Sequence, residues 1–468
     1  MSPPSKKMVS RALALILLVV GVGAGAGITY ASLLAGGQFN GGLCSSGKTV
    51  TLGLLTDRTD GLSSQGIRAA DAAALAINDI NSYVSSSGCN LKFVVSVYDY
   101  QLDSSKAQSD LSALAAAGVQ VVVGPLNSGA LSNLISYSDS NHIVLISPSS
   151  TSAGLDLAIS SSKYYFRTAP DDRWQGMADA RMIQAEGATK LVLVQRHDTY
   201  GDALANATAN NFKFLLGNTG TVDTSGCVAS DVVCIIQYDP NISDFTSTIT
   251  SIYSGFTALN GTAPNKVAIN DVAFEEFSQM IYQIKSQHSN LLGGSLPGCG
   301  PVPGCVGSGK ISIWTGTDGE SQDSVISSNS TSGTYFTTNR LPSTVYGFLD
   351  NPQATALNST FTSTYTNNIC DNYCRGTYDD MWIAALGTLS AGSYSGTKIQ
   401  PIIPTVAAHY YGVTGWNGLD GNGDRIASIY QVWKVVASGT SYTWVYAGSW
   451  TADTTPNTPG TLSDFNPY

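Results

Sequence analysis

Two stretches in the first third of the chain share one pattern: VVVGPLNSGALSNL at 121–134 and HIVLISPSSTSAGL at 142–155. Each is an apolar run that ends in a short loop of Ser, Asn, Pro and Gly and continues into a segment of small residues. A short run that is apolar throughout is typical of a strand buried on both faces of a parallel sheet. Two such strands with hydroxyl-rich ends indicate polar groups gathered at one edge of that sheet.

Strands and helices alternate on the N-terminal side of these loops as well. KTVTLGLL (48–55) and LKFVVSVYDY (91–100) are predicted strands, and GIRAADAAALAINDINSY (66–83) between them is a predicted helix. Its apolar period places four residues on one face: Ile67, Ala70, Ala74 and Ile77. Asp103 is expected to cap the next helix, and Ser128 to open the one after it. This alternation predicts an α/β fold with a doubly wound parallel sheet.

The pattern then repeats with a second set of apolar runs, which predicts a second lobe of the same type. The runs are KLVLVQ (190–195), CIIQY (234–238), KVAIN (266–270) and KISIW (310–314). The tail differs, because 409–435 and 441–450 are turn-rich and alternate in the manner of antiparallel strands. Within it LDGNGD (419–424) resembles the start of a calcium loop. Gln431 stands where such a loop needs Glu, so a tight hairpin is favoured.

Length and charge restrict the function classes. The chain has 468 residues, enough for two domains behind a targeting segment. Only 12% of the residues are charged and the formal net charge is −10. Nucleic acid is therefore excluded as a partner, because no basic surface is available to follow a phosphate backbone.

The N-terminus has the composition of a membrane-targeting segment. Lys6, Lys7 and Arg11 precede an uncharged stretch, 12–38, that exceeds the roughly 20 residues needed to cross a bilayer. Residues 1–11 are then expected in the cytoplasm and everything after 38 outside the cell membrane. The stretch is either a retained anchor, which its length favours, or a cleaved signal peptide; a lipid-modified Cys44 is a third option.

Eight cysteines agree with an extracytoplasmic location, where disulfides persist. Four disulfides are expected, three of them from local spacing and the first from the pair that remains: Cys44 with Cys89, Cys227 with Cys234, Cys299 with Cys305, and Cys370 with Cys374. A zinc site is the alternative, which the absence of CxxC and the four scattered histidines disfavour. Five Asn-x-Ser/Thr sequons are consistent with exposure outside the cell: Asn206, Asn241, Asn260, Asn329 and Asn358.

The hydroxyl-rich loops suggest an anion site. Ligands of parallel α/β sheets bind beyond the carboxyl ends of the strands. The N–H groups that begin a helix favour an anion, and Ser or Thr adds a hydroxyl donor. Ser128, Ser149 and Thr151 are therefore candidates to hold one carboxylate. The alternative is that these hydroxyls only cap helices.

Six blocks in order make the resemblance to a known family specific. They are GLLTDRTDGLSSQGIRAADAAALAINDIN, VYDYQLDSSKA, VVVGPLNSGAL, VLISPSSTSAGL, YFRTAPDDRWQGMADA and LVLVQRHDTYGDALA. Together they resemble the extracellular ligand-binding receptor family, the type I periplasmic binding proteins of the branched-chain amino acid class. The resemblance is close over 48–215 and looser to about 430. It implies two α/β lobes, joined by three crossover segments, that close on a small molecule.

The resemblance also implies roles for individual residues. Ser128 in the loop after the third strand would contact the ligand carboxylate. In SPSST, Ser149 would supply a backbone group and Thr151 a hydroxyl. From the second lobe, Tyr200 of HDTYG would pack on the ligand and Asp318 of TGTDGE would pair with its amine. Taken alone, Asp318 is also an ordinary turn residue and Tyr200 an ordinary core aromatic.

Two positions depart from the family pattern. Gln65 stands near the first loop, where the family often has an aromatic, and is a further candidate for ligand contact. After KVAIN, neither Asn270, Asp271 nor Phe274 matches the expected second-lobe aromatic, so the side-chain pocket stays unassigned. Glu275 and Glu276 are interpreted as a solvated helix face.

These observations predict an extracytoplasmic solute-binding protein, without cofactor or metal, that delivers an amino acid-like ligand to the membrane permease of an ABC importer. A sensor ectodomain on the same fold is the alternative. A secreted hydrolase is a third reading, with His197 and Asp198 as its acid–base candidates and no nucleophile motif to accompany them. The expected organisation is a cytoplasmic N-terminus at 1–11, a signal peptide or anchor at 12–38, a linker at 39–47, lobe I at 48–168 and 340–415, and lobe II at 169–339 and 416–468.

Overall fold

The computed structural model describes residues 42–260, 267–291, 313–339, 341–347, 350–365, 368–426, 429–453 and 458–466. The chain divides into two compact units. Unit 1 is built from the described parts of Met1–Ser150, Asp156–Ala169 and Phe348–Ile426. Unit 2 is built from those of Thr151–Leu155, Pro170–Gly347 and Ala427–Tyr468.

Unit 1 contains a parallel five-stranded sheet with the strand order β2-β1-β3-β4-β5. Its strands are β1 (Thr49–Thr56), β2 (Lys92–Asp99), β3 (Val121–Val123), β4 (Val144–Ser147) and β5 (Tyr165–Arg167). One face is covered by α3 (Ser63–Ser86) and α13 (Asn372–Ala391), and the other by α4 (Ser104–Ala116) and α5 (Ser128–Asn141). The strand order brings the ends of β1, β3 and β4 side by side.

The predicted face of α3 was wrong at Ile67 and Ala74, whereas Ile77 is buried and Ala70 is partly buried against the core. Ile67 is 40% exposed and Ala74 is also exposed. The buried stripe consists mainly of small residues: Ala69, Ala72, Ala73, Ala76 and Ile80. Small side chains let α13 pack closely against α3, so helix-to-helix packing decided the face and the larger isoleucine faces out.

The helix starts agree with the sequence. Asp103 caps α4 by accepting hydrogen bonds from the N–H groups of Ser105 (2.7 Å) and Lys106 (3.0 Å). Helix α5 begins at Ser128, as expected. The remaining elements of unit 1 are α12 (Pro352–Thr364), α14 (Gly396–Ile399), η4 (Gln400–Ile402), α15 (Ile403–His409), β12 (Tyr411–Gly412) and β13 (Gly415–Trp416).

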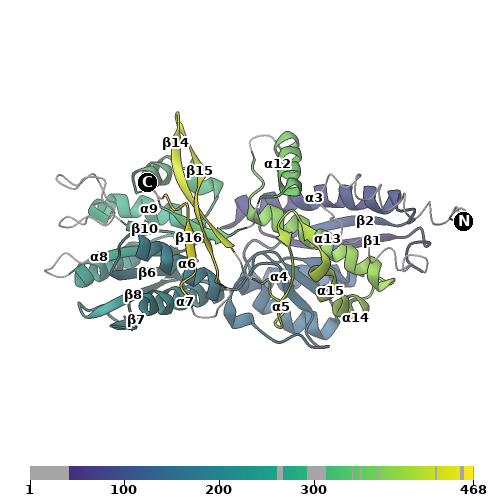
Figure 1. Cartoon of the computed structure of the whole chain (residues 1–468), viewed down its shortest axis with the longest axis horizontal. Helices are drawn as coiled ribbons and strands as arrows, with labels where there is room; N and C mark the ends of the chain where they lie inside the picture. Colours follow the sequence, from purple (N-terminus) through teal and green to yellow (C-terminus); the bar gives the residue numbers. More distant parts are fainter. Residues whose placement is uncertain are drawn as a thin grey trace, which may run out of the picture. The chain divides into compact units, whose positions relative to one another are not determined.

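Unit 2 contains a second parallel sheet, with the order β10-β9-β6-β8-β7. Its strands are β6 (Lys190–Arg196), β7 (Thr221–Asp223), β8 (Asp231–Tyr238), β9 (Val267–Val272) and β10 (Ile313–Thr315). Helices α6 (Asp172–Ala185) and α7 (Thr199–Leu215) pack on one face, and α8 (Thr246–Asn260) and α9 (Glu276–Gln287) on the other (Figure 1).

The antiparallel strands predicted for the tail are confirmed in an additional sheet of unit 2, with the order β11-β14-β15-β16. They are β11 (Ser343–Tyr346), β14 (Ile429–Ser438), β15 (Ser441–Thr451) and β16 (Thr461–Ser463). Unit 2 also contains η2 (Ala153–Leu155), η3 (Ser289–Leu291), α10 (Ser324–Ser328) and α11 (Ser330–Asn339).

Three of the expected disulfides are formed: Cys44–Cys89, Cys227–Cys234 and Cys370–Cys374. The fourth expected pair, Cys299 with Cys305, lies outside the described residues, as do the N-terminus at 1–11 and the predicted anchor or signal peptide at 12–38. Among the helices that the structure describes, none is both long and apolar enough to span a membrane.

Candidate ligand-binding groups at the strand ends

In unit 1 the loops after β3 and β4 are joined by serine hydroxyls. Ser149 Oγ donates to the carbonyl of Leu126 at 2.6 Å, and Ser147 Oγ donates to the carbonyl of Pro125 at 2.6 Å. The Ser149 hydroxyl proton is thus used within the protein. Ser149 can therefore serve a ligand carboxylate through its backbone N–H rather than through its hydroxyl.

Ser128 lies at the start of α5 and is buried. Asn127, the N-cap residue, makes no capping hydrogen bond with its side chain. Its Oδ1 instead accepts the hydroxyl of Tyr100 at 2.9 Å. The Asn127 side chain is therefore used by Tyr100 and does not cap the first turn of α5, although Asn is a common N-cap residue.

The loop after β1 brings two more buried polar residues to this edge. Gln65, in the first turn of α3, is fully buried and its Oε1 accepts the hydroxyl of Ser64 at 2.8 Å. Asp57, the residue that follows β1, is also fully buried, and its Oδ2 accepts the N–H of Leu62 at 2.8 Å. Sequence reasoning missed Asp57, although an acid directly after a buried strand was a readable signal.

In unit 2 the structure brings Tyr200 and Asp318 together. The hydroxyl of Tyr200 donates to Asp318 Oδ1 at 2.6 Å and lies 3.0 Å from Thr317 Oγ1. Gln175 Nε2 donates to the same carboxylate oxygen at 2.9 Å. Burial raises the pKa of Asp318, and the hydrogen bonds from Tyr200 and Gln175 oppose that rise.

A second buried acid is connected to Asp318 through neutral groups. Gln175 Nε2 also donates to Thr344 Oγ1 at 3.1 Å, and Thr344 Oγ1 donates to Asp179 Oδ1 at 2.5 Å. Asp179 is fully buried, and desolvation raises its pKa well above the ordinary value. Neither Gln175 nor Asp179 was singled out from the sequence, because both lie inside a helix pattern that reads only as amphipathic.

Phe274, which the sequence left unassigned, packs against Tyr200. Its ring stacks on Tyr200 with 5.2 Å between centroids and a 17° interplanar angle. The Arg196 guanidinium lies over the Phe274 ring as well, 3.7 Å from its centroid. Tyr200 is therefore fixed by ring packing and by its hydroxyl at the same time.

The interpretation of Glu276 as part of a solvated face was wrong. Glu276 Oε1 accepts Arg196 Nη1 at 2.7 Å and the hydroxyl of Tyr238 at 2.9 Å. Its side chain is only 14% exposed. The buried arginine on the neighbouring strand needs a counter-charge, and the first turn of α9 supplies it.

Thr151, the third hydroxyl candidate, belongs to unit 2 rather than to unit 1. Thr151 is fully buried in the short segment 151–155 of unit 2, and its carbonyl accepts the N–H of Asp172 at 2.8 Å.

His197, the first acid–base candidate, is exposed, with Nδ1 2.9 Å from Asp202 Oδ1. Asp198 caps α7 by accepting the N–H groups of Tyr200 and Gly201. The Asp198 carboxylate thus has a structural task that accounts for its position.

The turn that resembles a calcium loop is held by the protein's own cations. Lys163 Nζ donates to the carbonyl of Asn422, and Arg167 binds Asp424 through Nε at 2.6 Å and Nη2 at 2.7 Å. Asp420 Oδ1 accepts the N–H of Asn422 at 2.8 Å, inside the turn. The turn is thus a hairpin held by hydrogen bonds and by the ion pair of Arg167 with Asp424.

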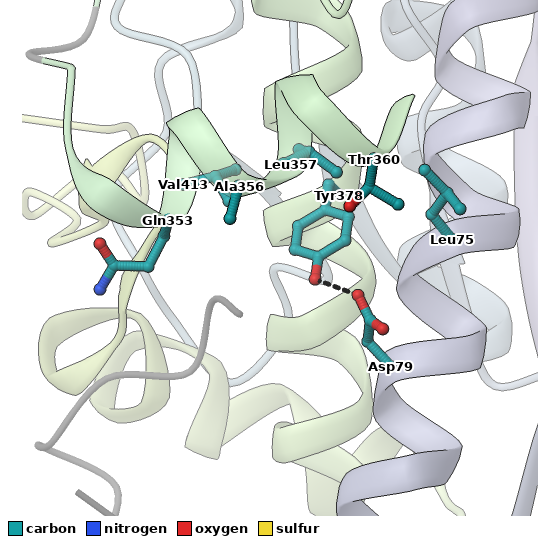
Figure 2. A pocket seen from close by; sticks show the side chains of 8 residues that line it. All are labelled: Leu75, Asp79, Gln353, Ala356, Leu357, Thr360, Tyr378 and Val413. Carbon is teal, nitrogen blue, oxygen red and sulfur yellow. Dashed lines mark hydrogen bonds between the residues drawn. The ribbon is translucent and has the colours of Figure 1, made fainter. Parts of the chain in front are cut away.

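A small cavity in unit 1 lies among helices rather than at the strand ends. It measures about 50 Å³ and is lined by Leu75, Asp79, Gln353, Ala356, Leu357, Thr360, Tyr378 and Val413. Figure 2 shows the Tyr378 hydroxyl donating to Asp79 Oδ2, at 2.7 Å, between α3 and α13. This space holds a few waters at most and is too small for an amino acid.

Comparison with known proteins agrees with this architecture. Residues 49–255 match the family described as periplasmic binding protein. An uncharacterized protein of Methanocaldococcus jannaschii is 25% identical over 451 residues, which cover 91% of this chain and 98% of that protein.

Solved structures show the same fold. A leucine-binding protein of Thermotoga maritima matches with a TM-score of 0.63 and 16% identity, over 85% of this chain and 97% of its own. A branched-chain amino acid transporter substrate-binding protein of Streptococcus pneumoniae, solved with isoleucine, matches with a TM-score of 0.61 and 17% identity, over 85% and 99%. The chain thus has the fold of the type I periplasmic binding proteins, and its residues 49–255 match the periplasmic binding protein family.

Proposed function

We propose that this chain is the extracytoplasmic solute-binding protein of an ABC importer, which binds an amino acid or a similar small zwitterion or amide and delivers it to a membrane permease. The match of residues 49–255 to the periplasmic binding protein family supports solute binding. The ligand class and the permease are the proposal. The segment at 12–38 would anchor the chain to the membrane or direct its export.

Each unit supplies proposed ligand contacts of its own. The start of α5 with Ser128, together with the N–H of Ser149, would bind the carboxylate from unit 1, and Gln65 would contact the ligand there too. From unit 2, Thr151 would add a hydroxyl, Tyr200 would pack on the ligand and Asp318 would accept its ammonium. The observation that supports this most directly is the 2.6 Å hydrogen bond from Tyr200 to Asp318, because it places a ring and a buried acid together.

Calorimetry with the full chain in detergent tests the proposal against a panel of amino acids, amides and short peptides. Binding of at least one of them is expected, and Ser128→Ala should weaken it. Ser132→Ala is the matched control, because Ser132 is an exposed serine in the same helix. If no compound of the panel binds, the proposal is wrong.

A further inference from the structure

Glu320 links the ends of two neighbouring strands of unit 2. β9 and β10 are paired in parallel, and Glu320 lies in the turn that follows β10. Its Oε1 accepts the N–H of Ala273, directly after β9, at 3.1 Å. Its Oε2 accepts the N–H of Thr317 at 2.7 Å and the hydroxyl of Thr317 at 2.9 Å. One side chain thus ties the turn that contains Asp318 to the segment after β9.

The turn lies directly against that segment. A Cβ atom on Gly319 would come 2.1 Å from the carbonyl oxygen of Ala273 and 2.6 Å from Cδ1 of Phe274. Only glycine allows this approach. Phe274 is also the residue whose ring stacks on Tyr200. The turn, Phe274 and Tyr200 therefore belong to one packed group.

The Thr317 hydroxyl connects Glu320 with the pair of Tyr200 and Asp318. Because Thr317 donates its proton to Glu320, its oxygen faces the Tyr200 hydroxyl, 3.0 Å away, as an acceptor. Tyr200 in turn donates to Asp318 Oδ1 at 2.6 Å. The orientation of Thr317 therefore influences where the Tyr200 hydroxyl lies and, through that hydroxyl, the carboxylate of Asp318.

The contacts of Glu320 require a side chain that accepts hydrogen bonds at both ends. Glu320 and Thr317 are fully buried. Burial raises the pKa of Glu320 well above its ordinary value and the charge of Asp271 adds to the rise, whereas the hydrogen bonds from Thr317 favour the ionised form. A carboxylate accepts at both oxygens, but an amide has a donor at one end. Glutamine at this position would leave one buried donor facing another donor.

An acid in a loop often serves only the local backbone. Asp323, in the same loop, is an example, because its carboxylate caps α10 by accepting the N–H of Ile326 at 2.9 Å. Glu320 differs from it. The oxygen that holds the N–H of Thr317 also accepts the hydroxyl that reaches Tyr200.

We propose that Glu320 is a positioning residue for ligand binding. It holds Thr317 so that the Tyr200 hydroxyl and the Asp318 carboxylate keep the arrangement that receives the ligand ammonium. Glu320 itself does not touch the ammonium in this arrangement, which rests on the proposed function of Asp318. Side chains that contact a ligand are effective only when the contacts behind them keep them in place.

Calorimetry of the full chain in detergent, with each of the common amino acids as a probe, tests this role. Glu320→Gln should weaken binding of the tightest-binding amino acid about tenfold, as expected when one hydrogen bond at a charged group is lost. In a chain that already carries Asp318→Asn, the same substitution should change the affinity by less than about twofold, because its effect passes through Asp318.

Asp323→Asn is the matched control. Asp323 is a buried acid of the same loop, and asparagine caps a helix about as well as aspartate does. The affinity of this variant should equal that of the natural chain.

Two substitutions of Thr317 separate positioning from packing. Thr317→Val keeps the shape and the backbone N–H but removes the hydroxyl, and it should weaken binding about tenfold. Thr317→Ser keeps the hydroxyl and should stay within about twofold of the natural affinity. A role in packing alone predicts the opposite order, because valine preserves the buried volume. If Glu320→Gln does not fold, this pair decides.

Equal losses from Glu320→Gln in the natural chain and in the Asp318→Asn chain would overturn the role of Glu320, as would natural affinity in Thr317→Val. Either result would leave the proposed function standing. Failure of every amino acid to bind the natural chain would instead overturn the proposed function.

Discussion

The two units present different chemistry on the same architecture. At the ends of β1, β3 and β4, unit 1 offers helix starts, backbone N–H groups and serine hydroxyls, with Asp57 as its buried acid. At the ends of β10, β9 and β6, unit 2 offers acids and rings joined through side chains. Backbone donors are fixed by the turn itself, whereas a buried acid such as Asp318 needs Tyr200 and Gln175 to hold it. The fold therefore determines the edge of unit 1 more directly than that of unit 2.

The largest expected effect concerns the stability of the units. Cys44–Cys89 of unit 1 closes 45 residues, and Cys227–Cys234 of unit 2 closes 7. Loop-closure entropy predicts a loss of about 4 kcal/mol for the double alanine variant of the first pair and about 2.4 kcal/mol for the second. Hydrogen exchange with mass spectrometry, as a function of denaturant, reports each unit through its own peptides. A larger loss in unit 2 would contradict the entropic argument.

Asp318→Asn should have the second largest effect, which is a loss of ligand affinity. The amide cannot carry the charge that the ligand ammonium needs, and removal of one partner of a buried ion pair costs roughly 3 kcal/mol, or about a hundredfold in affinity. Titration calorimetry with the amino acid that binds measures this. Asp239→Asn, an exposed acid after β8, is the control. An unchanged affinity would show that Asp318 is only a turn residue.

Asp57 should make stability depend on pH in the unusual direction for an acid. Its pKa is raised to about 7 in the folded chain, so between its ordinary value of 3.8 and 7 the folded state binds more protons than the unfolded state. Its contribution is therefore present below about pH 4 and is lost as the pH rises to 7. Relative to the natural chain, Asp57→Asn should gain roughly 2 kcal/mol between pH 4 and pH 6.

Denaturant unfolding followed in peptides of unit 1 measures that gain, with Asp60→Asn as the charge-matched control. The same gain in both variants would mean that the general acidity of the loop, rather than the burial of Asp57, is responsible.

The sequence predicted the architecture well, because long apolar runs and helix starts are local signals. Asp103 capping α4 and Ser128 opening α5 were both readable from a few neighbouring residues. The face of α3 was not readable, since the exposure of Ile67 depends on α13, some 300 residues later in the chain.

The same limit applies to the candidate groups of unit 2. Tyr200 and Asp318 were found through family resemblance, and their hydrogen bond agrees with a shared place. Phe274 was left unassigned and Glu276 was misjudged, because the contacts of both involve Arg196 on another strand. Contacts between distant segments leave no periodic trace in the sequence, so side-chain networks are predicted worse than strand ends.

Tyr200→Phe is expected to give the smallest effect. It separates the contribution of the Tyr200 ring from that of its hydroxyl group. Phenylalanine keeps the stack on Phe274 but loses the hydroxyl that binds Asp318 and Thr317. One hydrogen bond to a charged group contributes about 1.5 kcal/mol, so ligand affinity should fall roughly tenfold. Tyr282→Phe, at a tyrosine that is 57% exposed, should change nothing. If the affinity of Tyr200→Phe is unchanged, the ring of this residue, rather than its hydrogen bonds to Asp318 and Thr317, positions the ligand. The strand ends of unit 2 would then depend on ring packing, whereas those of unit 1 depend on backbone groups.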